Sequence, residues 1–82
     1  MTFSAKVSII LKAGIADPQG QTIERALPAL GYDAVKNVRV GKLIELEVEA
    51  DDAADAKSSV EEMCERLLAN PVIEAYAVEV TP

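Results

Sequence analysis

Histidine and tryptophan are absent from this chain of 82 residues, and cysteine occurs once, as Cys64. Because histidine is the commonest general base and metal ligand, its absence disfavours most catalytic and metal-binding sites. A single cysteine cannot form an internal disulfide, which suits a reducing compartment. No apolar run approaches the roughly 20 residues that a membrane-spanning helix needs, and the first residues do not resemble a signal peptide. We therefore expect a cytoplasmic protein without membrane contact.

Positive charge is also scarce, since 8 Lys and Arg residues stand against 14 Asp and Glu residues, for a net charge of −6. This balance disfavours binding to DNA or RNA, whose phosphates require clustered cations. The charge is unevenly distributed, with a net of +2 over residues 1–41 and −8 over residues 42–82. Apolar residues make up 50% of the chain, which is enough for a core. We expect residues 1–82 to form one small domain.

Alternating apolar residues predict four strands, at residues 3–12, 35–40, 43–50 and 72–80. Gly41-Lys42, between the second and third strands, predicts a two-residue hairpin turn of the Gly-X type. In the third strand, apolar residues alternate with Glu45, Glu47 and Glu49. This acidic row is typical of a strand with one face in water.

Two helices are expected between these strands. Asp17 is the predicted N-cap of the first helix, Pro18 its first helical residue and Gly31 its end, while Pro28 should shorten its last turn. Asp51 or Asp52 caps the second helix, which ends before Pro71. The apolar stripes that should face the sheet are Ile23, Ala26, Leu27 and Leu30 in the first helix and Ala53, Ala56, Val60, Met63, Cys64 and Leu67 in the second.

The order β-α-β-β-α-β predicts a ferredoxin-like, split βαβ fold of the α+β class. This fold is a two-layer sandwich with a four-stranded antiparallel sheet and both helices on one face. The other sheet face should be polar in a monomer, but the first and fourth predicted strands place Ile10, Ile73, Ala75 and Ala77 on it. An apolar patch on an uncovered face predicts that the sheet packs against a second copy of the chain.

The sequence offers little that could carry catalysis. Cys64 lies on the apolar stripe of the second helix with no histidine to activate it, so we expect a small buried side chain. The carboxylates at Asp51, Asp52 and Asp55, and at Glu61, Glu62 and Glu65, fit helix capping and a solvated face. A metal or acid–base site there is the less favoured alternative. We expect no catalytic, cofactor-binding or metal-ligating residue in this chain.

Two short segments are candidates for contact with a partner. Asp17, Pro18, Gln19 and Gly20 start the first helix, where backbone N–H groups can meet an anion. Arg39, Gly41 and Lys42 place two cations beside a turn. The simpler interpretations are a capped helix and an exposed hairpin. The sharper interpretation is that these polar, exposed residues contact partner proteins.

The order of several motifs resembles one protein family, the PurS small subunits of phosphoribosylformylglycinamidine synthase. The resemblance covers residues 5–76, although Ala13 and Ala16 replace a proline and a larger aliphatic residue that are common in the family. The matching motifs are LKAGIADPQG at residues 11–20, IERAL at 23–27, LGY at 30–32, VRVGKLIEL at 38–46, MCERLLANPVIE at 63–74, and Tyr76.

The resemblance implies a role in de novo purine biosynthesis. The complex converts formylglycinamide ribonucleotide (FGAR) to its amidine (FGAM) with ATP and glutamine. A glutaminase subunit releases ammonia, and a large synthetase subunit uses ATP and Mg²⁺ to add that ammonia to the substrate. The small subunit, a homodimer or dimer of dimers without cofactor or catalytic residue, bridges the two and assists ammonia transfer.

Two other functions remain open at this point. One is a ferredoxin-like regulatory module that binds a small molecule at the Gly14 loop before the first helix. The other is an independent enzyme that uses the carboxylates of the second helix. Stabilisation by an amino acid or nucleotide would favour the first, and stabilisation by a metal ion the second.

Overall fold

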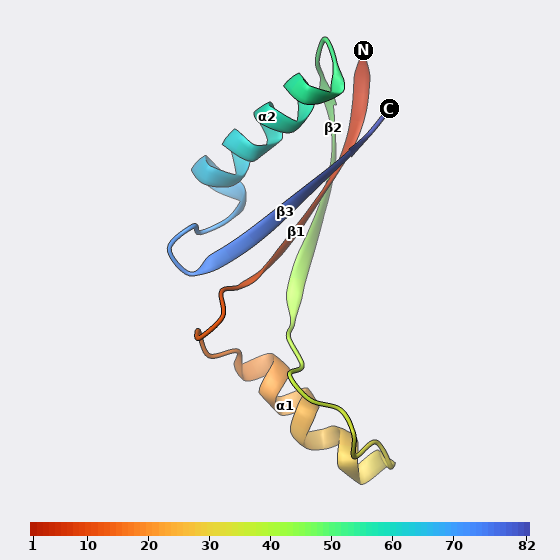
Figure 1. Cartoon of the computed structure of the whole chain (residues 1–82), viewed down its shortest axis with the longest axis vertical. Helices are drawn as coiled ribbons and strands as arrows, with labels where there is room; N and C mark the ends of the chain where they lie inside the picture. The colour runs from red at the N-terminus through yellow and green to blue at the C-terminus, as the bar shows by residue number, and fades with distance from the viewer.

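The computed structural model describes all residues from Met1 to Pro82. A three-stranded antiparallel sheet carries one helix on its face, while the other helix lies beyond the end of the sheet (Figure 1). The two chain termini lie at the opposite end (Figure 1). The elements are β1 (Thr2–Leu11), α1 (Pro18–Ala26) with a 3₁₀ turn (Leu27–Leu30), β2 (Gly41–Glu49), α2 (Ala53–Met63) with a π turn (Cys64–Leu68), and β3 (Glu74–Thr81).

The long β1 is the central strand of the sheet, which has the order β2-β1-β3. Val7 of β1 lies opposite Ile44 of β2 on one side and Val78 of β3 on the other. The predicted alternation of β1 is confirmed, because Phe3, Ala5, Val7 and Ile9 are buried and the intervening residues are exposed. This face of the sheet is therefore apolar along most of its length, with Lys42 opposite Ile9 and Glu74 opposite Leu11 at one end.

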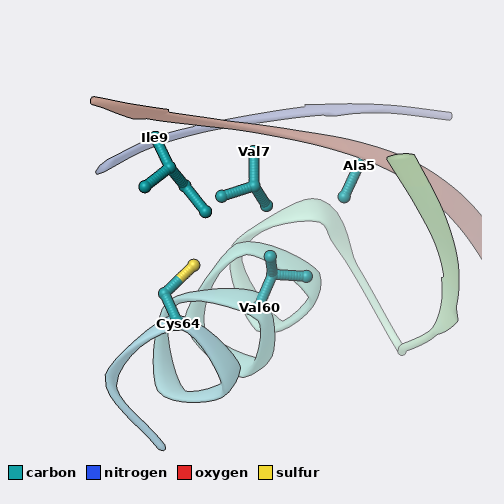
Figure 2. Packing of buried hydrophobic residues seen from close by; sticks show 5 residues of the cluster. All are labelled: Ala5, Val7, Ile9, Val60 and Cys64. Atoms are coloured by element: carbon teal, nitrogen blue, oxygen red, sulfur yellow. The ribbon is translucent and has the colours of Figure 1, made fainter. Parts of the chain in front are cut away.

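The hydrophobic core lies between β1 and α2. Val60 of α2 and Cys64, the first residue of the following π turn, point toward Ala5, Val7 and Ile9 of β1 (Figure 2), and all five residues are buried. The i, i+4 spacing of the two helix residues places them on the same face of α2. The partly buried Ile44, Leu46, Tyr76 and Val78 pack around this cluster.

The predicted helix ends are largely confirmed. Asp17 caps α1 with Pro18 in the first turn, and Gly31 ends the helical stretch with a φ of 95°. From Leu27 the helix tightens into a 3₁₀ turn, as expected around Pro28, which has no N–H to donate. Asp52 is the N-cap of α2, where its carboxylate accepts from the Asp55 N–H at 2.8 Å. The turn that follows α2 is widened, because the Ala69 N–H donates to the Cys64 carbonyl five residues earlier.

The strand predicted at residues 35–40 is wrong, and so is the hairpin at Gly41-Lys42. The segment from residue 31 to residue 40 is irregular, and Gly41 is the first residue of β2, opposite Ile10. The reason is that the segment's amides have other partners: the N–H groups of Val38 and Val40 donate to side-chain carboxylates near α1. The sheet thus has three strands where four were predicted. The last strand begins at Glu74 rather than at residue 72.

The α+β class with an antiparallel sheet is confirmed, but α1 does not cover the sheet of its own chain (Figure 1). The Cα radius of gyration is 16.2 Å, and the molecule measures 51 × 26 × 14 Å. A compact domain of this length would have a radius of gyration of about 12 Å. Residues 12–40, here called the α1 arm, therefore project from the sheet as an extension.

Candidate functional site

Cys64, the only thiol, is fully buried against β1. Burial raises the pKa of this thiol, and the nearby carboxylates of Glu61 and Glu65 raise it further. A buried neutral thiol cannot reach a substrate or act as a nucleophile. The prediction of a small buried side chain at this position is confirmed.

The acidic residues of α2 do not gather into a site. No group of three or more Asp, Glu or Cys side chains is arranged to hold a metal ion. Asp52 and Asp55 instead lie at the helix start, as the capping interpretation predicts. Glu62 forms an exposed ion pair with Arg66 at 3.6 Å, one turn along the same helix. These carboxylates are therefore surface groups of α2.

Asp17 is the most connected side chain among the predicted partner contacts. Its Oδ1 accepts from the Gly20 N–H at 3.0 Å, and its Oδ2 accepts from the Val40 N–H at 2.8 Å. The Arg39 Nε lies 3.6 Å from Oδ2. The pKa of Asp17 is lowered chiefly by the Gly20 hydrogen bond, then by that from Val40, with the Arg39 charge adding less. This carboxylate is buried, so it is not available to a partner.

Gly20 and Arg39 also serve contacts within the chain. A Cβ at Gly20 would lie 2.3 Å from the Val38 carbonyl oxygen, so only glycine allows this approach. The Arg39 Nη2 donates to the Leu11 carbonyl at 2.6 Å, and the Lys12 carbonyl lies 3.4 Å away. The end of β1, the start of α1 and the start of β2 are joined in this way.

The remaining predicted partner residues are exposed. Pro18 and Gln19 line a surface hollow of about 540 Å³ together with Ile23. Gln19 also borders a second hollow of about 180 Å³, which Gly41 and Lys42 line. The structure therefore separates the seven predicted partner residues into two groups. Asp17, Gly20 and Arg39 make contacts within the chain, although Arg39 is also exposed. Pro18, Gln19, Gly41 and Lys42 are exposed.

The uncovered sheet face brings together most of the residues predicted for self-association. Ala75 of β3 lies opposite Ile10, and Ala77 lies opposite Ser8, whose other neighbour is Leu43. Ile10 is 46% exposed and Leu43 is 56% exposed. Ile73 stands just before β3, where its carbonyl accepts from the Lys12 N–H at 2.8 Å. We call Ile10, Leu43, Ile73, Ala75 and Ala77 the apolar patch.

Leu43 was missing from the predicted patch, although its position could have been read from the sequence. It shares the alternation of Glu45, Glu47 and Glu49, so it belongs to the same face of the strand. Toward the chain termini, this face becomes mainly acidic, because the three glutamates are joined by Glu79 of β3, and Lys6 of β1 lies between Glu45 and Glu79. The open face thus has an apolar half and an acidic half.

A second apolar surface lies on the α1 arm. Leu30 is 72% exposed and Tyr32 is 59% exposed, and Ile23 is also exposed. On the covered face of the sheet, Ile44 and Leu46 of β2 are only half-buried, as are Tyr76 and Val78 of β3. Exposed apolar surface of this extent on a small chain is typical of a protein that binds other chains.

Comparison with known proteins assigns the family. The family described as PurS: Phosphoribosylformylglycinamidine (FGAM) synthase matches residues 4–82. The PurS subunit of phosphoribosylformylglycinamidine synthase from Methanocaldococcus jannaschii is 46% identical over 78 residues, covering 95% of this chain and 94% of that protein. The Bacillus subtilis PurS subunit is 46% identical over 78 residues, covering 95% of this chain and 92% of that protein.

Solved structures agree with this assignment. The crystal structure of PurS from M. jannaschii superposes with a TM-score of 0.85 at 44% identity, covering 96% of this chain and 95% of that one. A chain in the structure of PurLQS from Thermotoga maritima superposes with a TM-score of 0.89 at 40% identity, covering 99% of each chain. The resemblance found in the sequence is confirmed, and the chain belongs to the PurS family of phosphoribosylformylglycinamidine synthase.

Proposed function

We propose that this chain is the non-catalytic small subunit of a phosphoribosylformylglycinamidine synthase that converts FGAR to FGAM with ATP and glutamine. The match to PurS subunits over nearly the whole chain carries the proposal. The burial of the only thiol and the two exposed apolar surfaces also support a role in binding rather than in chemistry. The chain would work as one domain in the cytoplasm, and partner subunits would use the ATP, Mg²⁺ and glutamine. The alternative of a small-molecule-binding module is not favoured.

We propose further that the chain acts as a homodimer or a dimer of dimers. The apolar patch can be covered by a second copy, and burial of apolar surface is the main driving force of such association. The acidic half of the same face would disfavour a symmetric contact there, because like charges would meet. The self-association surface therefore lies toward the α1 end of the sheet, where Gly41 and Lys42 also lie.

The proposed task of the assembled subunit is to bridge a glutaminase and a synthetase subunit. A chain in PurLQS from T. maritima superposes on this one over nearly its full length, which supports a place in a complex of that kind. Ammonia released into water becomes protonated at neutral pH and then cannot attack. A bridge that excludes water between two active sites would keep the nucleophile reactive. Pro18, Gln19 and Lys42 are exposed residues from which a partner contact can be built.

The test is a reconstitution with the cognate glutaminase and synthetase subunits, with and without this chain. FGAM formation would be measured with glutamine and, in parallel, with ammonium chloride as the nitrogen source. We expect glutamine-dependent turnover to require the chain, while ammonia-dependent turnover persists without it. Equal rates in both reactions with and without the chain would contradict the proposed function.

The matched variant for partner contact is Lys42→Glu combined with Gln19→Glu. Both side chains are exposed, so the variant should fold. Loss of the glutamine-dependent rate, together with loss of co-elution in gel filtration, would support contact at this surface. Lys57→Glu, an exposed charge reversal on α2, is the control.

A further inference from the structure

The direction of the α1 arm cannot be set by a hydrophobic core. Within residues 12–40 only Asp17 and Gly20 are buried, and no apolar side chain of the arm is. α1 also lies off the end of the sheet, so its apolar stripe does not pack against the sheet of its own chain (Figure 1). The orientation of α1 relative to the sheet therefore depends on polar contacts.

These contacts attach α1 at two points. At its start, Asp17 accepts from the Val40 N–H at 2.8 Å. About two turns later, the Glu24 Oε1 accepts from the Val38 N–H at 2.9 Å. Seven helical residues span roughly 10 Å at 1.5 Å per residue, and positions 17 and 24 share one side of the helix. Two attachments separated along an axis define a direction, which a single attachment would not.

The chain that receives these bonds is itself tied to the sheet. Val40 directly precedes Gly41, the first residue of β2, and Arg39 donates to the Leu11 carbonyl at the end of β1. Arg39 also lies 3.6 Å from Asp17. Two side-chain carboxylates and one guanidinium thus connect α1 to the sheet and fix its orientation relative to the sheet. We call Asp17, Glu24 and Arg39 the polar clamp.

We propose that Asp17 is the positioning residue that sets the direction of the α1 arm and thereby presents its exposed apolar side chains to a second copy of this chain. The second copy is the fitting occupant because its β2 keeps Ile44 and Leu46 half-buried on the sheet face that carries α2. This contact lies on the opposite sheet face from the apolar patch, and a dimer of dimers would use both surfaces. The arm carries Leu30 and Tyr32 on its exposed surface. The inference rests on the proposed self-association, but the orientation of the arm can be measured separately.

The decisive variant is Asp17→Ser. Serine caps a helix as well as aspartate does, so the bond to the Gly20 N–H can persist. Its short hydroxyl cannot also reach Val40 and Arg39, so only the clamp is removed. Asp52→Ser is the matched control, because Asp52 is also an N-cap but its carboxylate bonds only to the Asp55 N–H of its own helix.

Spin labels at Ala29→Cys, near the end of the arm, and at Ser58→Cys, on the exposed side of α2, report the arm's orientation within one chain. Cys64→Ala would be present in every variant, and labelled protein would be diluted tenfold with unlabelled protein. We expect one narrow distance distribution for the parent and for Asp52→Ser. Asp17→Ser should broaden it at least twofold, and Asp17→Asn, which keeps one acceptor oxygen, should lie between them.

The dimer–monomer midpoint, measured by light scattering across a dilution series, completes the test. We expect Asp17→Ser to raise the midpoint concentration at least tenfold while the circular dichroism of the fold is unchanged. An unchanged distance distribution overturns the positioning role. A broadened distribution with an unchanged midpoint overturns the link to the second copy. A parent that stays monomeric contradicts the proposed self-association, although the distances still decide what holds the arm.

Discussion

Two regions of this chain meet at the end of β1 and differ in what they bury. The region formed by the sheet and α2 buries only apolar side chains and Cys64, in a core between β1 and the helix. The α1 arm buries a carboxylate and a glycine, and leaves its apolar side chains in solvent. The first region has a hydrophobic core of its own. The second region has no hydrophobic core, and its apolar side chains are not covered within the single chain.

The difference shows how one chain can divide two tasks. Apolar burial is non-directional and gives stability, so it suits the part that must fold alone. Hydrogen bonds and ion pairs are directional but contribute little net free energy each, so they suit a part that must point in a set direction. The apolar side chains that the arm does not use internally remain available for binding.

The largest effect is expected from truncation of the core. Ile9→Ala should lower the free energy of unfolding by about 2–5 kcal/mol, because it removes buried methylene groups and leaves a cavity. Ile23→Ala, the same substitution at an exposed position of the arm, should change it by less than about 0.5 kcal/mol at concentrations where the chain is monomeric. Urea unfolding followed by circular dichroism measures both. Equal losses would show that the two regions share one core.

A charge in the apolar patch should have the next largest effect. Ile10→Asp places a carboxylate between Gly41 and Ala75, where a second copy is proposed to pack. Burying an unpaired charge is costly, so the dimer–monomer midpoint should rise at least a hundredfold. Ser4→Asp adds the same charge to the same strand face within its acidic half and should change the midpoint less than fivefold. Similar effects of the two variants would place the contact elsewhere.

The sheet and α2 could be predicted from the sequence because their elements repeat with clear periods. The alternation of Phe3, Ala5, Val7 and Ile9 was sufficient for β1, and the spacing of Val60 and Cys64 was sufficient for the inner face of α2. The segment at residues 35–40 shows the limit of this reasoning. Val38 and Val40 alternate as in a strand, but their amides bind carboxylates that lie 14 and 23 residues earlier. Periodicity contains no information on such non-local partners.

The candidate site was half predictable for a related reason. Exposure of Ile10, Ala75 and Ala77 follows from strand alternation, so the sequence placed them correctly. Asp17, Gly20 and Arg39 were predicted to face a partner because they are polar and lie in loops. The structure turns Asp17 and Gly20 inward, since each has a partner within the chain. Composition identifies polar loop residues, but only the fold shows which of them are already satisfied.

A methyl group at Gly20 should affect the arm and spare the core. Gly20→Ala puts a Cβ 2.3 Å from the Val38 carbonyl oxygen, which belongs to the backbone and cannot move without displacing residues 38–40. Steric overlap of this kind costs about 1–3 kcal/mol. Hydrogen exchange at the Val38 and Val40 amides should therefore accelerate about fivefold to a hundredfold, with exchange at Val7 unchanged. Gly14→Ala, at a position with open space but a φ of 86°, is a control for backbone strain without a clash.

Acid should loosen the arm before it affects the core. The pKa of Asp17 is lowered by the hydrogen bonds from Gly20 and Val40, so the folded state favours its ionised form. Its contribution is complete above the unfolded pKa of about 3.9 and is lost as the pH falls through the lower folded value. Exchange at the Val40 amide, corrected for its intrinsic pH dependence, should rise over that range. Asp17→Asn should abolish this dependence, and a persistent rise would implicate another carboxylate.

The smallest effect is expected at the hydrogen bond that joins β3 to the π turn. The Tyr76 hydroxyl donates to the Glu65 Oε2 at 2.8 Å, and the pKa of Tyr76 is raised to about 12, chiefly by this bond and further by burial and nearby negative charge. The bond favours the protonated phenol, so its stabilisation holds below the unfolded pKa of about 10 and is lost as the pH rises toward 12. In Tyr32→Phe, which leaves Tyr76 as the only tyrosine, ultraviolet absorbance should titrate near 12. Adding Glu65→Gln should lower that midpoint, because the amide oxygen carries no charge to hold the proton. An unchanged midpoint would mean that burial rather than Glu65 sets the pKa of Tyr76.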